Sequence, residues 1–279
     1  MAYKTVTTVV TNPETEKHAL ETAVDIAKQN GGHLDALCLG IDHTQPGFYY
    51  AGAAAMAMQS SLSEAESQAE KISGKVKEIL EGRDLNYSVE SLVAQTPGLA
   101  QFIGYHLRFS DLTVHSRPYG EGRLQDHEAI VEAALFDARV PVLVMPNGVK
   151  MPSAPRCAVV AWNESREALT AVRAAMPLLV AADRVNVVIV DPPAHAPDRS
   201  DPGGLLSQML ARHGANAEVS VLAKTLPRVS DVIARHVAEQ GAELLVMGAY
   251  GHSRFRESIL GGATRNMLQI ADVPLLMAH

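Results

Sequence analysis

The stretch Ala138-Arg-Val-Pro141-Val-Leu-Val-Met145 has a close copy at the end of the chain, Ala271-Asp-Val-Pro274-Leu-Leu-Met277. The two prolines lie 133 residues apart in a chain of 279. A second pair agrees, because Asp111-Leu-Thr-Val114 and Glu243-Leu-Leu-Val246 are offset by 132 residues. A fixed period near half the chain length indicates a duplication, so we expect two copies of one domain.

The segment between the two copies is rich in proline and glycine. It reads Pro146-Asn-Gly-Val-Lys-Met-Pro152-Ser-Ala-Pro155 and has no helical periodicity, as is typical of a linker. The sequence therefore predicts one domain over residues 1–146 and a second over residues 156–279. Each is long enough for an independent core.

Within the second copy, short apolar runs alternate with helical patterns. Strands are predicted at 157–161, 185–190, 217–222, 244–247 and 275–277, with helices near 164–182, 203–213, 228–240 and 262–271. The run Val185-Asn-Val-Val-Ile-Val190 is apolar on both faces, as a parallel strand covered by crossover helices requires. In the first copy, helices are predicted at 14–29, ending at Asn30-Gly31-Gly32, and at 53–80. The predicted fold class is α/β, with two tandem, doubly wound domains, each on a five-stranded parallel sheet.

Composition excludes several classes of protein. The chain has 24 Lys and Arg against 31 Asp and Glu, a formal charge of -7, and no basic run, which argues against a nucleic-acid partner. The N-terminus lacks a secretory signal, and the uncharged stretch 43–63 is too polar to span a membrane. Cys38 and Cys157 lie in predicted strands, so buried, inert thiols and a cytoplasmic location are expected.

A glycine-rich loop follows the strand at 244–247. It reads Gly248-Ala-Tyr-Gly251-His-Ser-Arg-Phe-Arg-Glu-Ser-Ile-Leu-Gly261-Gly262-Ala263-Thr264-Arg265. We expect positive φ at Gly248 and Gly251, and free N–H groups at the helix start formed by Gly261, Gly262 and Ala263, where the helix dipole favours an anion. The hydroxyl of Thr264 and the side chains of Arg254, Arg256 and Arg265 would add phosphate ligands. Glycines between a strand and a helix are also common without any ligand, so the loop alone does not decide the function.

The spacing of these glycines narrows the choice. Gly248, two residues, Gly251, nine residues and Gly261 resemble the nucleotide-binding signature of the universal stress protein family. The opening strand and loop Val159-Val-Ala-Trp162-Asn163-Glu-Ser165 also resemble that family. The chain as a whole resembles a tandem, two-domain member of it.

The resemblance implies a fold like that of the adenine-nucleotide alpha hydrolases and a site for ATP or AMP, with or without Mg²⁺. The adenine would lie near the ends of the first two strands of the second copy, where Val190 stands, and the phosphates would lie on the glycine loop. Asn163 takes the place of the family's aspartate, and Gly262 takes the place of a Ser or Thr that normally binds phosphate. These two departures predict weakened binding.

The resemblance also implies pairing of domains through their last strands. The runs at 140–145 and 273–277 are apolar, carry proline near their starts and are predicted to be edge strands. The two halves should therefore pack as an internal dimer with a pseudo-twofold axis. Whether two such chains also form a homodimer is not decided by this pairing.

The first copy departs from the glycine signature. Ser116 and Tyr119 replace its first two glycines, and Glu128 and Ala129 stand where Gly261 and Gly262 stand in the second copy. Glu128 and the neighbouring Asp126 would repel a phosphate. The sequence therefore predicts a degenerate first site and one nucleotide per chain.

Other residues admit two interpretations each. Ser165 is either a helix N-cap or a nucleophile, and the lack of a Gly-x-Ser-x-Gly elbow around it favours the N-cap. Trp162 either lines the nucleoside pocket or packs under the sheet. The eleven histidines form no metal-binding motif, and the loop 191–201 is either solvated or a weak cation site.

Three functions of different classes follow from these residues. We favour a regulatory module for stress responses, whose nucleotide occupancy is read by protein partners. The alternative is an interaction scaffold that no longer binds nucleotide. A slow ATPase is the third, although the sequence assigns no catalytic residue and no metal ligand.

Overall fold

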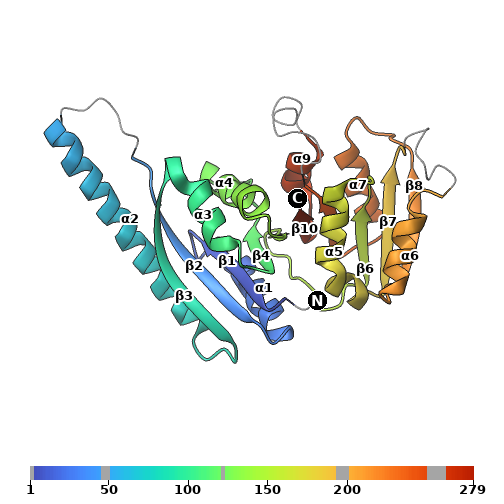
Figure 1. The fold of residues 1–279 in the computed structure, drawn as a ribbon, viewed down its shortest axis with the longest axis horizontal. Coiled ribbons are helices and arrows are strands. Elements are labelled where there is room, and N and C mark those ends of the chain that lie inside the picture. The colour runs from blue at the N-terminus through green and yellow to red at the C-terminus, as the bar shows by residue number, and fades with distance from the viewer. Residues whose placement is uncertain (1–2, 45–50, 121–122, 193–200, 250–261) are drawn as a thin grey trace. The chain divides into compact units, whose positions relative to one another are not determined.

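A computed structural model of the chain describes residues 3–44, 51–120, 123–192, 201–249 and 262–279. The chain divides into two compact units. The N-terminal unit comprises Tyr3–Ser116 and Gly122–Val140, and the C-terminal unit comprises Pro141–His279 with Arg117–Glu121 and the first two residues. Ribbons of both are drawn in Figure 1.

The N-terminal unit contains a parallel sheet in the order β3-β2-β1-β4. Its elements are β1 (Thr5–Val10), α1 (Lys17–Gln29), β2 (His33–Asp42), α2 (Ala51–Leu80), β3 (Asn86–Gln95), a 3-10 turn (Thr96–Gly98), α3 (Leu99–Leu107), β4 (Leu112–Ser116), α4 (Gln125–Ala133) and a π-helical turn (Ala134–Ala138). Helix α1 ends at the predicted residue, Gln29. Gly31 stops the helix just after it by adopting a left-handed φ of 53°.

The C-terminal unit contains strands in the order β5-β10-β9-β6-β7-β8. Its elements are β5 (Val142–Met145), β6 (Cys157–Ala161), α5 (Arg166–Ala181), β7 (Arg184–Val190), α6 (Gly204–Arg212), β8 (Ala217–Leu222), α7 (Val229–Glu239), β9 (Leu244–Gly248), α9 (Ala263–Ile270) and β10 (Leu275–Ala278). Strands β6 to β10 pair in parallel, which confirms the α/β fold predicted for the second copy. Strands β6, β7 and β9 are buried along nearly their whole length, as the continuous apolar runs predict.

The two repeated proline-containing strands pair with each other. Strand β5 runs antiparallel to β10, with Leu143 opposite Leu276. Strand β10 pairs with β9 on its other side, so the predicted pairing of the last strands of the two copies is confirmed. The segment Arg117–Glu121 joins the same unit, since the backbone N–H of Arg117 donates to the carbonyl oxygen of Met145 at 2.9 Å.

Both cysteines are buried, as predicted. Cys38 is 0% exposed and Cys157 is 3% exposed. Burial raises the pKa of Cys38 to about 12 and also raises the pKa of Cys157. Thiols in this state are poor nucleophiles. None of the helices that the structure describes combines the length and apolar character needed to cross a bilayer.

Candidate functional site

A crevice of about 100 Å³ opens at the carboxyl ends of three strands of the C-terminal unit, β6, β7 and β9. This is the position at which open α/β sheets bind their ligands. Its walls are Ala161, Trp162, Asn163, Val188, Val190, Val229, Ile233, Met247, Gly248 and Ala263. The fold thus brings together four of the predicted site residues, Asn163, Val190, Gly248 and Ala263.

The turn after β6 positions Asn163. The side-chain oxygen of Asn163 accepts a hydrogen bond from the backbone N–H of Ser165 at 3.2 Å, and Glu164 between them adopts a left-handed φ of 60°. The hydroxyl of Ser165 accepts in turn from the backbone N–H of Ala168 at 3.1 Å and caps α5. Ser165 is therefore an N-cap, and the NH₂ group of Asn163 is the part of this side chain that can serve a ligand.

Gly248 has a packing role at the end of β9. A Cβ atom at this position would lie 2.5 Å from the backbone nitrogen of Ala168 and 2.7 Å from the carbonyl carbon of Glu167. The first turn of α5 can therefore approach β9 only because position 248 lacks a side chain. Gly248 is not among the residues with positive φ, so the prediction of positive φ there was wrong.

The N-terminus of α9 faces the crevice through its first residue, Ala263. Gly262 is the N-cap and provides no side-chain cap, and the first turn of α9 contains no acidic residue. Thr264, predicted to bind phosphate, is only 2% exposed and does not line the crevice. The exposed Arg265 places its guanidinium carbon 5.7 Å from the centre of the Tyr119 ring.

Four predicted phosphate ligands, Gly251, Arg254, Arg256 and Gly261, lie outside the described residues. Trp162, by contrast, has a defined place. It lines the crevice, and its backbone N–H extends the sheet by donating to Val188 at 2.9 Å. Of the two interpretations of Trp162, the structure selects the crevice wall.

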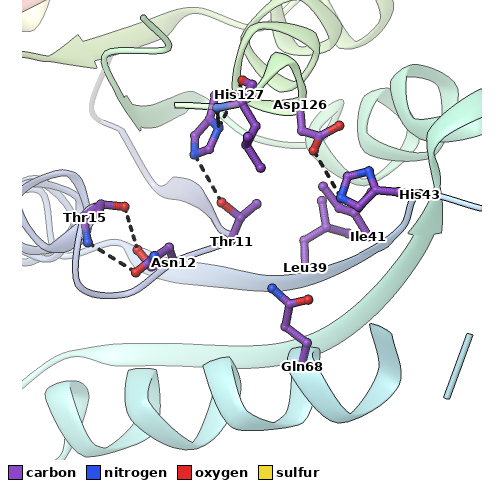
Figure 2. A pocket seen from close by; sticks show the side chains of 10 residues that line it. Thr11, Asn12, Thr15, Leu39, Ile41, His43, Gln68, Asp126 and His127 are labelled. Atoms are coloured by element: carbon purple, nitrogen blue, oxygen red, sulfur yellow. Dashed lines mark hydrogen bonds and ion pairs between the residues drawn. The ribbon is translucent and has the colours of Figure 1, made fainter. Parts of the chain in front are cut away.

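The N-terminal unit has a crevice of about 140 Å³ at the carboxyl ends of β1 and β2 (Figure 2). Its walls are Thr11, Asn12, Thr15, Leu39, Ile41, His43, Gln68, Leu124, Asp126 and His127. No lysine, arginine or glycine stands among these described wall residues. The chemistry of this crevice therefore differs from that of a phosphate site.

A buried carboxylate, Glu16, occupies the hydrogen-bond donors at the end of β1. It is 6% exposed and accepts from the backbone N–H groups of Thr11 at 2.7 Å and Asn12 at 3.0 Å. Nε2 of His127 lies 3.2 Å and Nη1 of Arg123 lies 3.5 Å from Oε1 of Glu16. The donors that an anionic ligand would use are thus taken by the protein's own anion.

These contacts set the protonation of the cluster. Burial alone would raise the pKa of Glu16, but hydrogen bonds from His127 and from the backbone of Asn12 and Thr11 outweigh it and hold the pKa below its ordinary value. Burial also lowers the pKa of the neighbouring His115 to about 4, against a partial opposing effect of Glu16.

The cluster does not form a catalytic relay. The hydroxyl of Thr11 at 3.4 Å and the carboxylate of Glu16 at 3.2 Å both contact Nε2 of His127. The other ring nitrogen, Nδ1, faces the backbone N–H of Leu124 at 3.2 Å in a capping box. A nucleophile and an orienting carboxylate must use different nitrogens of the base, so this arrangement does not activate Thr11.

The carboxylate at the start of α4 is Asp126 rather than Glu128. Asp126 lines the crevice, whereas Glu128, two residues later in the same first turn of the helix, lies outside the lining. The repeat offset misplaces Glu128 because the π-helical turn at Ala134–Ala138 adds residues between α4 and β5 that the second copy lacks. Glu16, Arg123 and His127 were not found from the sequence, since only the fold brings them together.

Residues 156–279 match the profile of the universal stress protein family. The C-terminal part of the chain is therefore similar to the universal stress protein family. A curated universal stress protein from Synechocystis sp. is 32% identical over 73 residues, which are 26% of this chain and 24% of that protein. The chain thus matches about a quarter of the length of this relative.

Solved structures extend the likeness of fold to the whole chain. A universal stress protein from Archaeoglobus fulgidus is 15% identical and superposes with a TM-score of 0.72. The superposition covers 98% of this chain and 95% of that protein. The structure of a protein described as a putative universal stress protein from Pseudomonas aeruginosa is 15% identical and has a TM-score of 0.61. That superposition covers 99% of this chain and 92% of that protein. At these identities the likeness shows a shared tandem fold.

The histidines form no metal site in the part of the chain that the structure describes, where no group of three or more His, Cys, Asp or Glu side chains could hold a metal ion. His236, for example, is buried and lies 2.8 Å from the side-chain oxygen of Asn186. Most of the loop 191–201 lies outside the described residues.

Proposed function

We propose that this protein binds an adenine nucleotide, ATP or AMP, in the crevice of its C-terminal unit and acts as a regulatory module. The observation that carries the proposal is the convergence of Trp162, Asn163, Val190 and Gly248 on the start of α9 within one crevice. Protein partners would read whether the crevice is occupied.

The apolar part of the crevice suits a flat base. Val188, Val190 and Ile233 provide aliphatic walls, and Trp162 provides an aromatic one. Ligand sites combine such walls with a few polar groups that fix orientation. The NH₂ group of Asn163, beside these walls, is the polar group that we assign to the nucleoside.

The start of α9 suits phosphate. The helix dipole places partial positive charge at this end of α9, which favours a negatively charged group there. The absence of acidic residues from this first turn leaves that field uncancelled. In the N-terminal unit the corresponding turn of α4 carries Asp126 and Glu128, and Glu16 already binds the donors after β1. We therefore expect one nucleotide per chain.

Titration calorimetry with ATP tests both the ligand and its place. The variant Ala263→Glu puts a carboxylate at the first residue of α9, inside the crevice. Gln125→Glu is the matched control, because Gln125 is the first residue of α4 and exposed. Glutamate is favourable at the start of a helix, so both variants should fold.

We expect one site per chain in the wild type and in Gln125→Glu, and a loss of affinity of about a hundredfold or more in Ala263→Glu. Two sites per chain, or unchanged binding by Ala263→Glu, would show that the crevice is wrongly assigned. No binding of ATP or AMP to the folded wild type would contradict the nucleotide proposal and favour the interaction scaffold.

A further inference from the structure

The N-terminal crevice contains a carboxylate that the nucleotide proposal does not use. Asp126 is the second residue of α4 and is only 8% exposed, yet it lines the crevice. Its Oδ2 lies 3.6 Å from Nε2 of His43, whose side chain is 59% exposed. A nearly buried negative charge therefore faces the crevice beside a partner that can turn out into solvent.

Apart from His127, which contacts Glu16, the rest of the wall has no ionisable side chain and is partly apolar. Leu39, Ile41 and Leu124 give aliphatic surface, while Thr11 and Gln68 give a hydroxyl and an amide. Figure 2 shows Gln68 reaching from α2 toward Leu39, with Asp126 and His43 at the opposite side of the same space. The crevice thus joins a carboxylate and an amide across an apolar floor.

Two basic side chains of this region contact a different carboxylate, Glu16. His127 and Arg123 approach Glu16 at 3.2 and 3.5 Å, and both side chains are nearly buried. They are engaged with Glu16, whereas the carboxylate of Asp126 contacts the imidazole of His43 among the described residues. The crevice should therefore attract a cation and repel a phosphate.

We propose that the N-terminal crevice binds a small organic cation, a primary ammonium group on a short apolar body. The ammonium group donates to the carboxylate of Asp126 and the body lies against Leu39, Ile41 and Leu124. His43 gives up its place beside Asp126 when the cation enters. The volume of about 140 Å³ is below that of sites for drug-sized ligands, about 300 Å³ and more, which limits the ligand to a small amine.

Benzylamine at neutral pH is the probe, followed on the full chain by amide chemical shifts in NMR. Benzyl alcohol has nearly the same shape without the charge, and inorganic phosphate is the anionic control. We expect saturable shifts at residues of the crevice with benzylamine, binding of benzyl alcohol that is weaker by about tenfold or more, and no shifts there with phosphate. This test does not depend on nucleotide binding in the other unit.

Two variants and one control separate the charge of Asp126 from general effects. Asp126→Asn should weaken benzylamine by about tenfold or more. His43→Gln should bind it at least as tightly as the wild type, because the competing partner is removed. Asp84→Asn removes the same charge from a side chain that is 99% exposed and outside the crevice, and should change nothing.

Equal binding of benzylamine and benzyl alcohol, or binding of phosphate in this crevice, would overturn the proposal. So would a folded Asp126→Asn variant with unchanged affinity, or an equal loss in Asp84→Asn. If Asp126→Asn does not fold, the two probes and His43→Gln on folded protein still decide the question.

Discussion

Removal of the negative charge of Glu16 should destabilise the N-terminal unit strongly. In the variant Glu16→Gln, the side chain keeps its shape and one amide oxygen that can still accept from the backbone of Thr11. It loses the charge that faces the nearly buried guanidinium of Arg123 at 3.5 Å and the imidazole of His127 at 3.2 Å.

The size of the effect follows from these contacts. Breaking a buried ion pair by removing one partner costs about 3–5 kcal/mol, because the other charge stays buried without compensation. The amide oxygen of the glutamine recovers part of this loss, so we expect about 3 kcal/mol. With a urea dependence of about 2 kcal/mol per molar, the unfolding midpoint of the unit should fall by about 1.5 M.

Urea unfolding followed by far-ultraviolet circular dichroism measures this shift. Glu14→Gln is the matched control, since Glu14 is 78% exposed and pairs only with Lys75 at 3.0 Å among the described residues. That control should change stability by no more than about 0.5 kcal/mol. A double variant, Glu16→Gln with Arg123→Met, should be less destabilised than the sum of its single variants. A loss below about 1 kcal/mol for Glu16→Gln, or strict additivity in the double variant, would refute the proposed role of Glu16.

Three further predictions concern stability and reactivity. Burial lowers the pKa of His115 to about 4, so between pH 6.5 and 4 the unfolded chain takes up a proton that the folded unit excludes. Stability should therefore be retained above about pH 6.5 and decline toward pH 4 by up to about 3 kcal/mol, and His115→Gln should flatten this slope in urea titrations at several pH values. Gly248→Ala should destabilise the C-terminal unit by about 1–3 kcal/mol in thermal unfolding, because its Cβ meets the backbone of α5, whereas Gly74→Ala, with nothing within 4 Å, should not. Cys38 and Cys157, both buried, should resist a thiol reagent in the native protein and react as two thiols per chain in denaturant; rapid native labelling would contradict this.

The sequence was sufficient to predict the elements of the C-terminal unit because their signals are local. Strands β6 and β8 have the predicted bounds, and the helices differ from prediction by one or two residues at each end. The convergence of Asn163, Val190, Gly248 and Ala263 also follows from general geometry, since the carboxyl ends of parallel strands share one edge of a sheet.

Features that depend on tertiary contacts were not predictable from local sequence. The pairing of β5 with β10 was predicted from the repeat and the family resemblance, because the local sequence of β10 does not specify its neighbours. The conformation of Gly248 follows from the approach of α5 rather than from the loop that contains it. The π-helical turn at Ala134–Ala138 has no signal in the repeat, so the repeat offset aligned Gly261 with Glu128, which does not line the crevice.

The most direct test of the proposed function uses Trp162, the single tryptophan of the chain, which lines the crevice of the C-terminal unit. Its fluorescence therefore reports on that crevice. Titration with ATP should change the emission of Trp162 along a saturating curve that matches the calorimetric heat at one nucleotide per chain. Heat of binding without any change in this emission would contradict the assignment of the nucleotide to this crevice.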